Sequence, residues 1–446
     1  MVGEIQKQKY SEVDGYTYIP TNYFSYYKLD EEDIKNIVNN QDRIAFINIE
    51  LIQKLEGELN KVSEDKKSVV FDNNTKDEME DEFLLYFKNR LLEQGLVYSD
   101  RDIINFHTSI KSSKLVILSG MSGIGKSKLV TAYADALNLK TDNQFKFISV
   151  SPGWTDDSDL IGYADTLNMI YRPSDNELVE TLIEASKNTD KLYIVCLDEM
   201  NLARVEHYFS QFLSVLEADE KNRTLKLYNQ ELGNRLYNSE QYKPEIRIRD
   251  NVKFVGTVNM DESTFHFSNK VLDRADVINL GIMNFKQLVK ASSRKETITL
   301  NEGQFQKDYI EKFINTNKQI ELDDEIIEFL QELHDLISKF NNQLGIGPRV
   351  LKQIDSYMKN IPIMQDVFTR KMGIDLQIVQ RVLTKVRGSQ EELERLIGTY
   401  DKKHDQTQAS LIIDLFDDYN NISDFKESRS SIKMKAKELY LNGYTF

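Results

Sequence analysis

Short apolar runs alternate with amphipathic helical patterns through the middle of the chain. The apolar runs have the length of β-strands: KLVILS (114–119), FKFISV (145–150), KLYIVCLDE (191–199) and VKFVGTVN (252–259). Between them, KSKLVTAYADAL, ETLIEASKN and VEHYFSQFLSVLE repeat apolar residues at the period of a helix. Strands that are apolar throughout and separated by helices predict a parallel sheet covered on both faces. The expected fold class is therefore α/β.

Helical patterns flank this central part. Two helices are expected before the first strand: DEFLLYFKNRLLEQG, which ends at Gly95, and SDRDIINFHTSI, which begins with a Ser/Asp cap. After residue 286 a 3.6-residue apolar period predicts helices in the segments 324–344, 348–361, 376–388 and 410–421. The tyrosine-rich first 60 residues form a small mixed unit, and the polar stretch 60–81 suggests a linker or surface excursion.

These patterns predict three parts. They are an N-terminal domain with its linker at 1–80, an α/β domain at 81–285 and a helical region at 286–446.

Composition argues against several classes of protein, including membrane-spanning and secreted proteins. The formal net charge of −15 argues against non-specific coating of nucleic acid, which needs clustered Lys and Arg. The apolar runs are too short to cross a membrane, and the N-terminus has no secretory signal, so we expect a cytoplasmic protein. The single cysteine, Cys196, lies in the apolar run LYIVCL and is expected to be a buried core thiol.

The run GMSGIGKS matches the phosphate-binding pattern G-x-x-x-x-G-K-S between a predicted strand and a predicted helix. Its glycines let main-chain N–H groups face the phosphates, and the helix N-terminus adds positive potential. Lys126 should reach the β- and γ-phosphates, and Ser127 should bind Mg²⁺. The predicted nucleotide-binding residues are Gly120, Ser122, Gly123, Gly125, Lys126, Ser127 and Lys128.

Two acidic residues end the third apolar strand, where an open α/β sheet gathers its ligand-binding groups. We expect Asp198 to bind Mg²⁺ and Glu199 to orient and deprotonate the attacking water. Asn259 ends the fourth strand and is expected either to position that water or to cap the following segment.

Two arginines are candidates for neutralising charge on the phosphates. Arg274 follows Asn259 and either reaches the nucleotide of a neighbouring subunit or forms a surface ion pair. Arg349 begins a helix, where the positive helix end disfavours a cation, so we expect it to serve a bound anion.

The ordered blocks GMSGIGKS, IVCLDEMNLARVEHYFSQFLSVLE, GTVNMDESTFHFSNKVLDRADVI, GIGPRVLKQI and DLQIVQRVLTKVRG resemble the AAA+ ATPases of the McrB and dynein-related branch. This resemblance covers roughly residues 80–390. It implies a P-loop NTPase with a helical lid, in which Asn259 is sensor 1, Arg349 is sensor 2 and Arg274 is a trans-acting finger. It also implies a hexameric ring that uses ATP or GTP with Mg²⁺.

Two segments resemble inserts of that branch, one at 152–175 and a predicted hairpin at 224–250. In relatives both face the pore or a partner. We therefore expect exposed residues there to contact a partner or DNA, with Trp154, Tyr171, Arg172, Arg235 and Tyr237 as candidates. McrB itself prefers GTP and has Asn-Thr-Ala-Asp at sensor 1. The stretch Asn259-Met260-Asp261-Glu262 differs, which slightly favours ATP here.

Three functions are candidates for a chain with these residues. The first is the motor subunit of a McrBC-like restriction or antiphage complex, which drives a separate McrC-like nuclease and reaches DNA through the complex. The second is a MoxR-like chaperone that remodels a protein partner. The third, an autonomous nuclease built on Glu64-Asp65-Lys66, has little support because that triplet lies in the polar linker.

Overall fold

The computed structural model describes three short N-terminal strands and most of the chain after residue 75. The described residues are 11–13, 16–20, 26–29, 76–139, 143–259, 265–281, 305, 309–342, 344–362 and 367–445. The chain divides into two compact units, Met1–Asn74 and Thr75–Phe446, so the unit division precedes the boundary expected near residue 80. In the first unit, strands β1 (Ser11–Val13), β2 (Tyr16–Pro20) and β3 (Tyr26–Leu29) pair antiparallel in that order.

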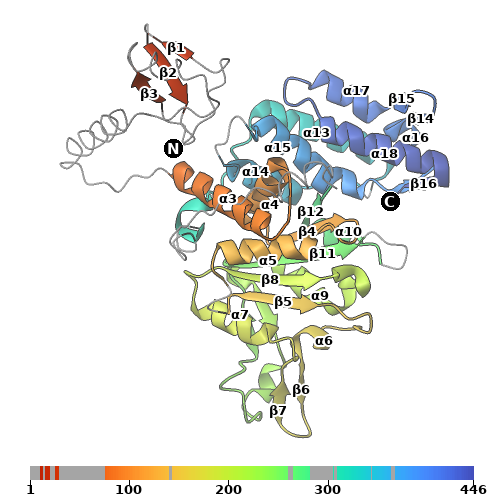
Figure 1. Ribbon diagram of the computed structural model, residues 1–446. Helices are drawn as coiled ribbons and strands as arrows, with labels where there is room; N and C mark the ends of the chain where they lie inside the picture. Colours follow the sequence, from red (N-terminus) through yellow and green to blue (C-terminus); the bar gives the residue numbers. More distant parts are fainter. Residues whose placement is uncertain are drawn as a thin grey trace. The chain divides into compact units, whose positions relative to one another are not determined.

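A five-stranded parallel sheet forms the centre of the second unit (Figure 1). Its strands are β4 (Leu115–Gly120), β5 (Phe145–Ser149), β8 (Tyr193–Asp198), β11 (Val252–Asn259) and β12 (Ala275–Asn279). Their order is β12-β4-β11-β8-β5, and every neighbouring pair is parallel. The predicted α/β class is confirmed. The strand β12 was not predicted, because ADVIN is short and follows the polar residues Asp273 and Arg274.

Each central strand contributes to two hydrophobic cores, one on each face of the sheet. In β4, Val116 and Leu118 join the core under one face, whereas Leu115 and Ile117 join the core under the other. Since successive side chains of a strand point to opposite faces, a strand buried on both sides must be apolar at every position. This is the physical reason for the apolar runs in the sequence.

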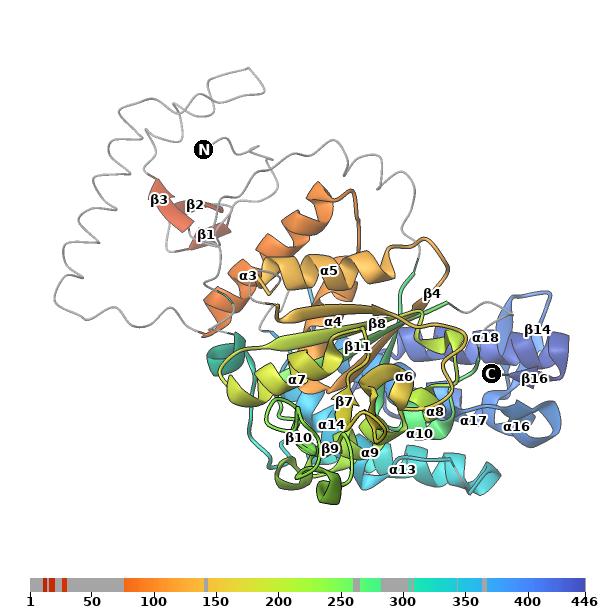
Figure 2. The ribbon, with the colours of Figure 1, turned by 90° about the horizontal axis from the view of Figure 1, so that it is seen from below.

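Helices cover both faces (Figure 2). One face carries α3 (Lys76–Glu93), α4 (Asp100–Ser112) and α5 (Lys126–Ala136). The other carries α7 (Leu178–Lys187), α8 (Val205–Tyr208) and α9 (Ser210–Glu217). The predicted capping of α4 is confirmed, because the side chain of Ser99 accepts a hydrogen bond from the N–H of Asp102 at 3.1 Å.

The polar stretch before residue 81 is not entirely a linker, which corrects the expectation from sequence. Residues 76–81 form the first turns of α3, and Glu80 is buried there. Its Oε1 lies 2.7 Å from Nε2 of His107 and also pairs with Lys111, while Nδ1 of His107 lies 2.6 Å from the hydroxyl of Tyr133. Burial lowers the pKa of His107 to about 4, so this imidazole is neutral near pH 7. A buried polar cluster thus explains why charged residues begin a packed helix.

The C-terminal region is helical, as predicted. It contains α13 (Asp324–Phe340), α14 (Pro348–Lys359), α15 (Arg370–Gln377), α16 (Gln390–Ile397), α17 (Leu411–Asp418) and α18 (Lys426–Asn442). A π-helical turn at Ile378–Val382 continues α15, and the hairpin β14–β15 (Thr399–Asp401, Gln406–Gln408) separates α16 from α17. Among the described helices, none is long and apolar enough to cross a membrane.

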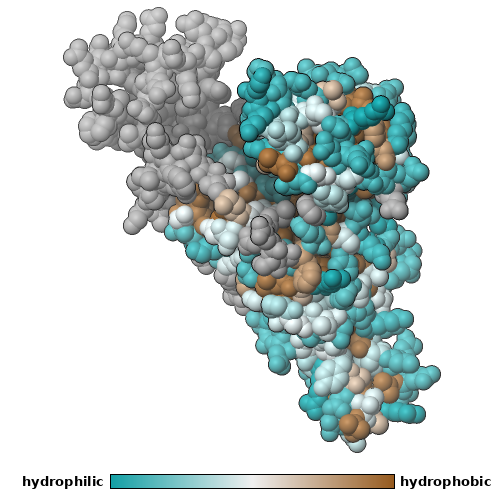
Figure 3. Space-filling view, turned by 90° about the vertical axis from the view of Figure 1, so that its right-hand side faces the viewer, coloured by the Kyte–Doolittle hydropathy of each residue, from teal (hydrophilic) through white to brown (hydrophobic). Residues whose placement is uncertain are grey.

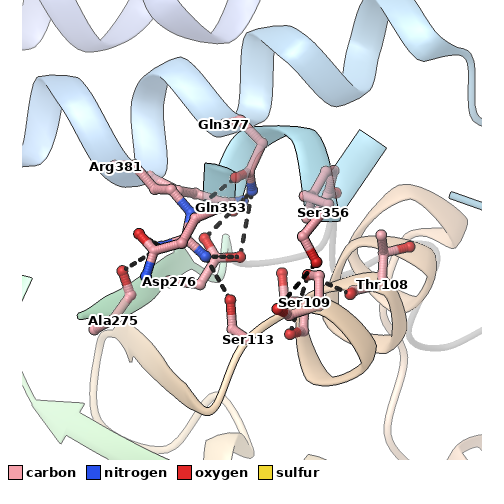
Figure 4. A network of polar contacts seen from close by, with 12 residues as sticks. Thr108, Ser109, Ser113, Ala275, Asp276, Gln353, Ser356, Gln377 and Arg381 are labelled. Atoms are coloured by element: carbon pink, nitrogen blue, oxygen red, sulfur yellow. Dashed lines mark hydrogen bonds and ion pairs between the residues drawn. The ribbon is translucent and has the colours of Figure 1, made fainter. Parts of the chain in front are cut away.

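A buried arginine ties this helical region to the edge strand of the sheet (Figure 4). Arg381 lies in the π-helical turn, and its guanidinium is 3.4 Å from the carboxylate of Asp276 in β12. It also donates to the carbonyl of Ala275 at 3.2 Å and to Oε1 of Gln377 and of Gln353, each at 2.9 Å. Burial lowers the pKa of Arg381, but a guanidinium stays charged, so these acceptors hold the two regions together.

Two hairpins form the inserts of this unit, and the first projects at the end far from the C-terminal helices (Figure 1). Strands β6 (Tyr163–Asp165) and β7 (Ile170–Arg172) form the first, and β9 (Thr224–Lys226) and β10 (Glu245–Arg247) form the predicted second. The side chain of Asn238 joins them: its Oδ1 accepts from the N–H of Tyr171, and its Nδ2 donates to the carbonyl of Tyr171, each at 2.8 Å. The N–H of Tyr237 also donates to the carbonyl of Met169 at 2.8 Å. The two inserts therefore form one body.

Candidate functional site

The loop between β4 and α5 requires glycine at two points. Gly120 has a φ of +152°, and a Cβ there would lie 2.5 Å from Ile124 and 2.9 Å from the carbonyl of Leu280. Gly125 has a φ of +91°, and a Cβ there would lie 2.7 Å from the hydroxyl of Tyr98. Side chains are excluded at both positions by space and by backbone conformation. This is the tight turn that a phosphate-binding loop needs.

Tyr98 braces this loop from the segment before α4. Its hydroxyl donates to the carbonyl of Ile124 at 2.9 Å. Burial raises the pKa of Tyr98 above its ordinary value, so the hydroxyl remains a donor at neutral pH. The brace was not predicted from the sequence.

Lys126 is buried, and its ammonium is held at the mouth of the loop. Nζ donates to the carbonyls of Gly120 at 2.9 Å and Met121 at 2.8 Å, and to Oδ1 of Asn259 at 2.7 Å. Asn259 is near because β11 runs beside β4 with Asn259 opposite Gly120. The structure thus brings the predicted lysine and the predicted sensor asparagine together.

Ser127 and Asp198, the two predicted magnesium ligands, also contact each other. The hydroxyl of Ser127 donates to Oδ1 of Asp198, which accepts a second hydrogen bond from the hydroxyl of Thr257 at 2.7 Å. A carboxylate and a hydroxyl are oxygen ligands of the kind Mg²⁺ prefers. Ser127 and Asp198 therefore fit a magnesium ion bound between the loop and β8.

Glu199 is held in a left-handed backbone conformation, with a φ of +52°. Its N–H donates to the hydroxyl of Thr257 at 3.0 Å, and its Oε1 accepts from Nδ2 of Asn259 at 3.0 Å. Such a conformation is uncommon for a residue other than glycine and persists where surrounding contacts fix it. Here these contacts hold the carboxylate beside Asn259, where a general base would meet water.

The side chain of Asn201 holds the main chain of Asn259. Its Nδ2 donates to the carbonyl of Asn259 at 2.9 Å, and the residue is buried. Asn201 and Thr257 were not singled out from the sequence. Thr257 had a signal, because it lies two residues before Asn259 and therefore on the same face of β11.

The other predicted residues of the loop lie at its surface. Ser122 and Gly123 are exposed in the loop, and Lys128 is exposed in the first turn of α5. Their roles in binding nucleotide stay predictions.

Arg274 and Arg349 lie away from this site, and both contact the same carboxylate. Arg274 pairs with Oε2 of Glu217, and Arg349 pairs with Oε1 of Glu217. Partial burial alone would raise the pKa of Glu217, but the charges of the two arginines hold it below its ordinary value. The anion that Arg349 serves within the chain is thus Glu217, a residue that the sequence analysis missed.

The sheet register shows how far this pair is from the loop. Arg274 immediately precedes Ala275, which lies opposite Leu115 at the start of β4, whereas the phosphate-binding loop begins at Gly120 at its end. At about 3.3 Å per residue, these two ends of β4 are roughly 16 Å apart. Arg274, and Arg349 that shares Glu217 with it, therefore lie where the strands of the sheet begin, at its amino edge. The glycine loop lies where the strands end, at the carboxyl edge.

Only some of the insert residues that were expected to be exposed are exposed in the structure. Tyr171 is buried, which corrects the prediction that it is available to a partner; its ring lies 5.3 Å from that of Tyr242. Trp154 is partly buried with its ring 5.2 Å from Tyr208, and Arg172 is exposed but pairs with Asp165 at 2.8 Å.

Arg235 is exposed as expected, and so is Tyr237, at 85%. Leu167, at the tip of the first hairpin, is 94% exposed. The tip therefore combines apolar side chains with a hydrophilic surround, visible as brown at the foot of the molecule in Figure 3. Glu64-Asp65-Lys66 and Met260-Asp261-Glu262 lie outside the described residues.

Two family models match separate parts of the chain. A model of the AAA domain (dynein-related subfamily) matches residues 115–275, and a model of a domain of unknown function (DUF8727) matches residues 298–444. No curated protein matches the chain.

Two solved structures are weakly similar. A "putative ATPase" from Cytophaga hutchinsonii is 14% identical with a TM-score of 0.42, and the match covers 69% of this chain and 89% of that one. Hsp104 of S. cerevisiae, in its extended complex with casein, is 15% identical with a TM-score of 0.33. That match covers 66% of this chain and 51% of Hsp104.

Proposed function

We propose that this chain, whose residues 115–275 match a model of the AAA domain (dynein-related subfamily), is the motor subunit of a McrBC-like restriction or antiphage complex. It would hydrolyse ATP or GTP with Mg²⁺ in a ring, hexameric as in the proteins it resembles. The ring would drive a separate McrC-like nuclease, and contact with DNA would be made through the complex.

The separation between the carboxyl edge and the amino edge of the sheet supports this proposal. Phosphate-binding groups gather at the carboxyl edge, while Arg274 and Arg349 lie at the other edge, roughly 16 Å along β4. Within one chain, neither arginine can neutralise charge on the nucleotide held by that chain. A second copy that places its arginine edge against the first copy's loop completes the site, and repetition of this head-to-tail contact closes a ring.

At the carboxyl edge the chain's own residues supply the hydrolytic groups. Lys126 is placed to bind the phosphates, and Ser127 and Asp198 would hold Mg²⁺, which would neutralise charge on the β- and γ-phosphates. Glu199 is oriented by Asn259 to take a proton from the attacking water. The same Asn259 contacts Lys126 through its other amide atom, so one side chain aligns the cation and the base.

The joined inserts supply a surface for a protein partner. The hydrogen bonds of Asn238 hold the two hairpins together, and Leu167 and Tyr237 project from them with most of their surface exposed. Exposed apolar and aromatic side chains on a rigid support are typical of protein contacts. This surface suits a docked nuclease subunit.

The same surface favours one alternative, a MoxR-like chaperone. Such a protein would use the apolar tip to engage a protein client rather than a nuclease. The two functions share the hydrolytic site and differ in the partner.

A phosphate-release assay on the full chain tests the choice. Release is measured with ATP and with GTP, with and without DNA, and with and without the protein encoded beside this one. The restriction proposal expects DNA cleavage that needs both proteins and a hydrolysable nucleotide. Hydrolysis that responds to the protein partner but not to DNA, with no cleavage, would contradict it in favour of the chaperone.

A further inference from the structure

The contacts of Arg274 and Arg349 differ although both pair with Glu217. Arg274 uses all three guanidinium nitrogens within the chain. Nε donates to the carbonyl of Leu213 at 2.8 Å, one Nη donates to the carbonyl of Lys270, and the other pairs with Glu217. Its side chain is only 16% exposed. Arg274 is therefore anchored by two main-chain carbonyls and a carboxylate, and three of its five N–H donors are used within the chain.

Arg349 has the opposite character. Among the described residues its only polar partner is Glu217, reached through one Nη, and its side chain is 42% exposed. A guanidinium carries five N–H donors in a planar fork, so Arg349 can keep this contact and still donate to a phosphate. Arg349 also lines a cavity of about 390 Å³, so there is space beside this residue.

We infer that Glu217 is a positioning residue for hydrolysis in the neighbouring subunit: Arg274 fixes Glu217, and Glu217 presents Arg349 to the phosphates of a second copy. This inference rests on the proposed function, because it needs two copies to share a site. The two arginines then have different roles. Arg349 contacts the phosphates of the second copy, whereas Arg274, expected from the sequence to make that contact, acts through Glu217.

The physical basis is the ordering of a long side chain before the nucleotide arrives. A free arginine loses much rotamer freedom when it is fixed on a ligand. Glu217 restricts Arg349 in advance by a charge-assisted hydrogen bond, and the three contacts of Arg274 keep the carboxylate itself in place. Small displacements of a group that stabilises the transition state have large effects on rate.

A double-mutant cycle on the assembled full-length chain tests this relay. The variants are Glu217→Gln, Arg349→Ala and the double variant, and the measurements are kcat and nucleotide affinity. Glu217→Gln should lower kcat by about ten- to a hundred-fold and leave nucleotide affinity unchanged, because the binding loop is at the other edge of the sheet. The double variant should be no slower than Arg349→Ala alone, since Glu217 acts only through Arg349.

Glu220→Gln is the matched control. It removes a nearby glutamate that, within the described residues, pairs with neither arginine, so its kcat should equal that of the unchanged chain. Arg274→Lys gives a second test if Glu217→Gln fails to assemble. It keeps the charge but removes the three-nitrogen anchor, so it too should lower kcat only while Arg349 is present.

The outcomes separate the relay from the proposed function. Normal hydrolysis by assembled Arg349→Ala would overturn both the shared site and the relay. Impaired Arg349→Ala with normal Glu217→Gln, or a further loss when Glu217→Gln is added to Arg349→Ala, would overturn the relay alone.

Discussion

The carboxyl edge of the sheet and the opposite edge differ in how completely their charges are matched within one chain. At the carboxyl edge, Asn259 contacts both Lys126 and Glu199, and the glycine loop beside them has the tight turn of a phosphate-binding loop. At the opposite edge, two guanidinium groups share the single carboxylate of Glu217. Under the proposed function, the carboxyl edge binds the phosphates of the chain's own nucleotide, and the amino edge offers its excess positive charge to a second copy.

This difference shows why an isolated subunit is expected to bind nucleotide well and hydrolyse it poorly. In the proposed mechanism, binding depends on groups that are already in contact, whereas stabilising the transition state needs arginines that one chain cannot bring to its own phosphates.

The largest expected effect is on hydrolysis at the carboxyl edge. Glu199→Gln removes the base but keeps the size of the side chain, so kcat should fall by about a thousand-fold while nucleotide still binds. Single-turnover hydrolysis and equilibrium binding of a labelled nucleotide measure the two properties separately. Hydrolysis at the original rate would show that Glu199 does not activate the water.

Binding itself should depend on Lys126. Lys126→Ala removes the buried ammonium that contacts Gly120, Met121 and Asn259, and nucleotide affinity should fall by about a hundred-fold, or about 3 kcal/mol. Lys187→Ala, at the exposed end of α7, is the control and should bind normally. Affinity retained in Lys126→Ala would place the phosphates elsewhere.

Mixing two inactive variants tests whether the edges come from different chains. Arg274→Ala subunits keep an intact loop, and Lys126→Ala subunits keep an intact arginine edge. Random mixing in equal amounts makes one kind of interface complete, so activity should recover to about a quarter of the original rate. Mixed rings are first verified by pull-down of differently tagged chains. Verified mixed rings that remain inactive would argue against a shared site.

The smallest effect concerns the loop's brace. Tyr98→Phe removes the hydroxyl that donates to the carbonyl of Ile124 and should weaken nucleotide binding by about five-fold, or about 1 kcal/mol. Tyr440→Phe, on the exposed side of α18, is the control and should bind as before. Unchanged affinity in Tyr98→Phe would show that the glycine turns hold the loop without the brace.

Sequence reasoning was strongest where one physical rule acts over a short stretch. Strands buried on both faces must be apolar throughout, so β4, β5, β8 and β11 were predictable, and so were the glycine loop and the acidic strand end. The short strand β12 escaped because it has too few apolar residues to stand out.

Contacts between distant segments could not be predicted. Glu217 lies 57 positions before Arg274 and 132 before Arg349, and nothing in the segment VEHYFSQFLSVLE, which forms α8 and α9, marks its last residue as the shared partner. Tyr171 looked like an exposed loop residue, but the second hairpin covers it. Such contacts depend on how helices and loops return across the sheet, which local periodicity does not encode.

The side-chain amide of Asn238 limits how the two inserts can be exchanged between related proteins. It satisfies both main-chain groups of Tyr171, 67 positions earlier, so each insert completes the hydrogen bonding of the other. A chimera that exchanged only one hairpin with a relative would leave a donor and an acceptor unsatisfied on the hairpin that remained. The two inserts should therefore be inherited and transplanted together, although strand β8 lies between them in the chain.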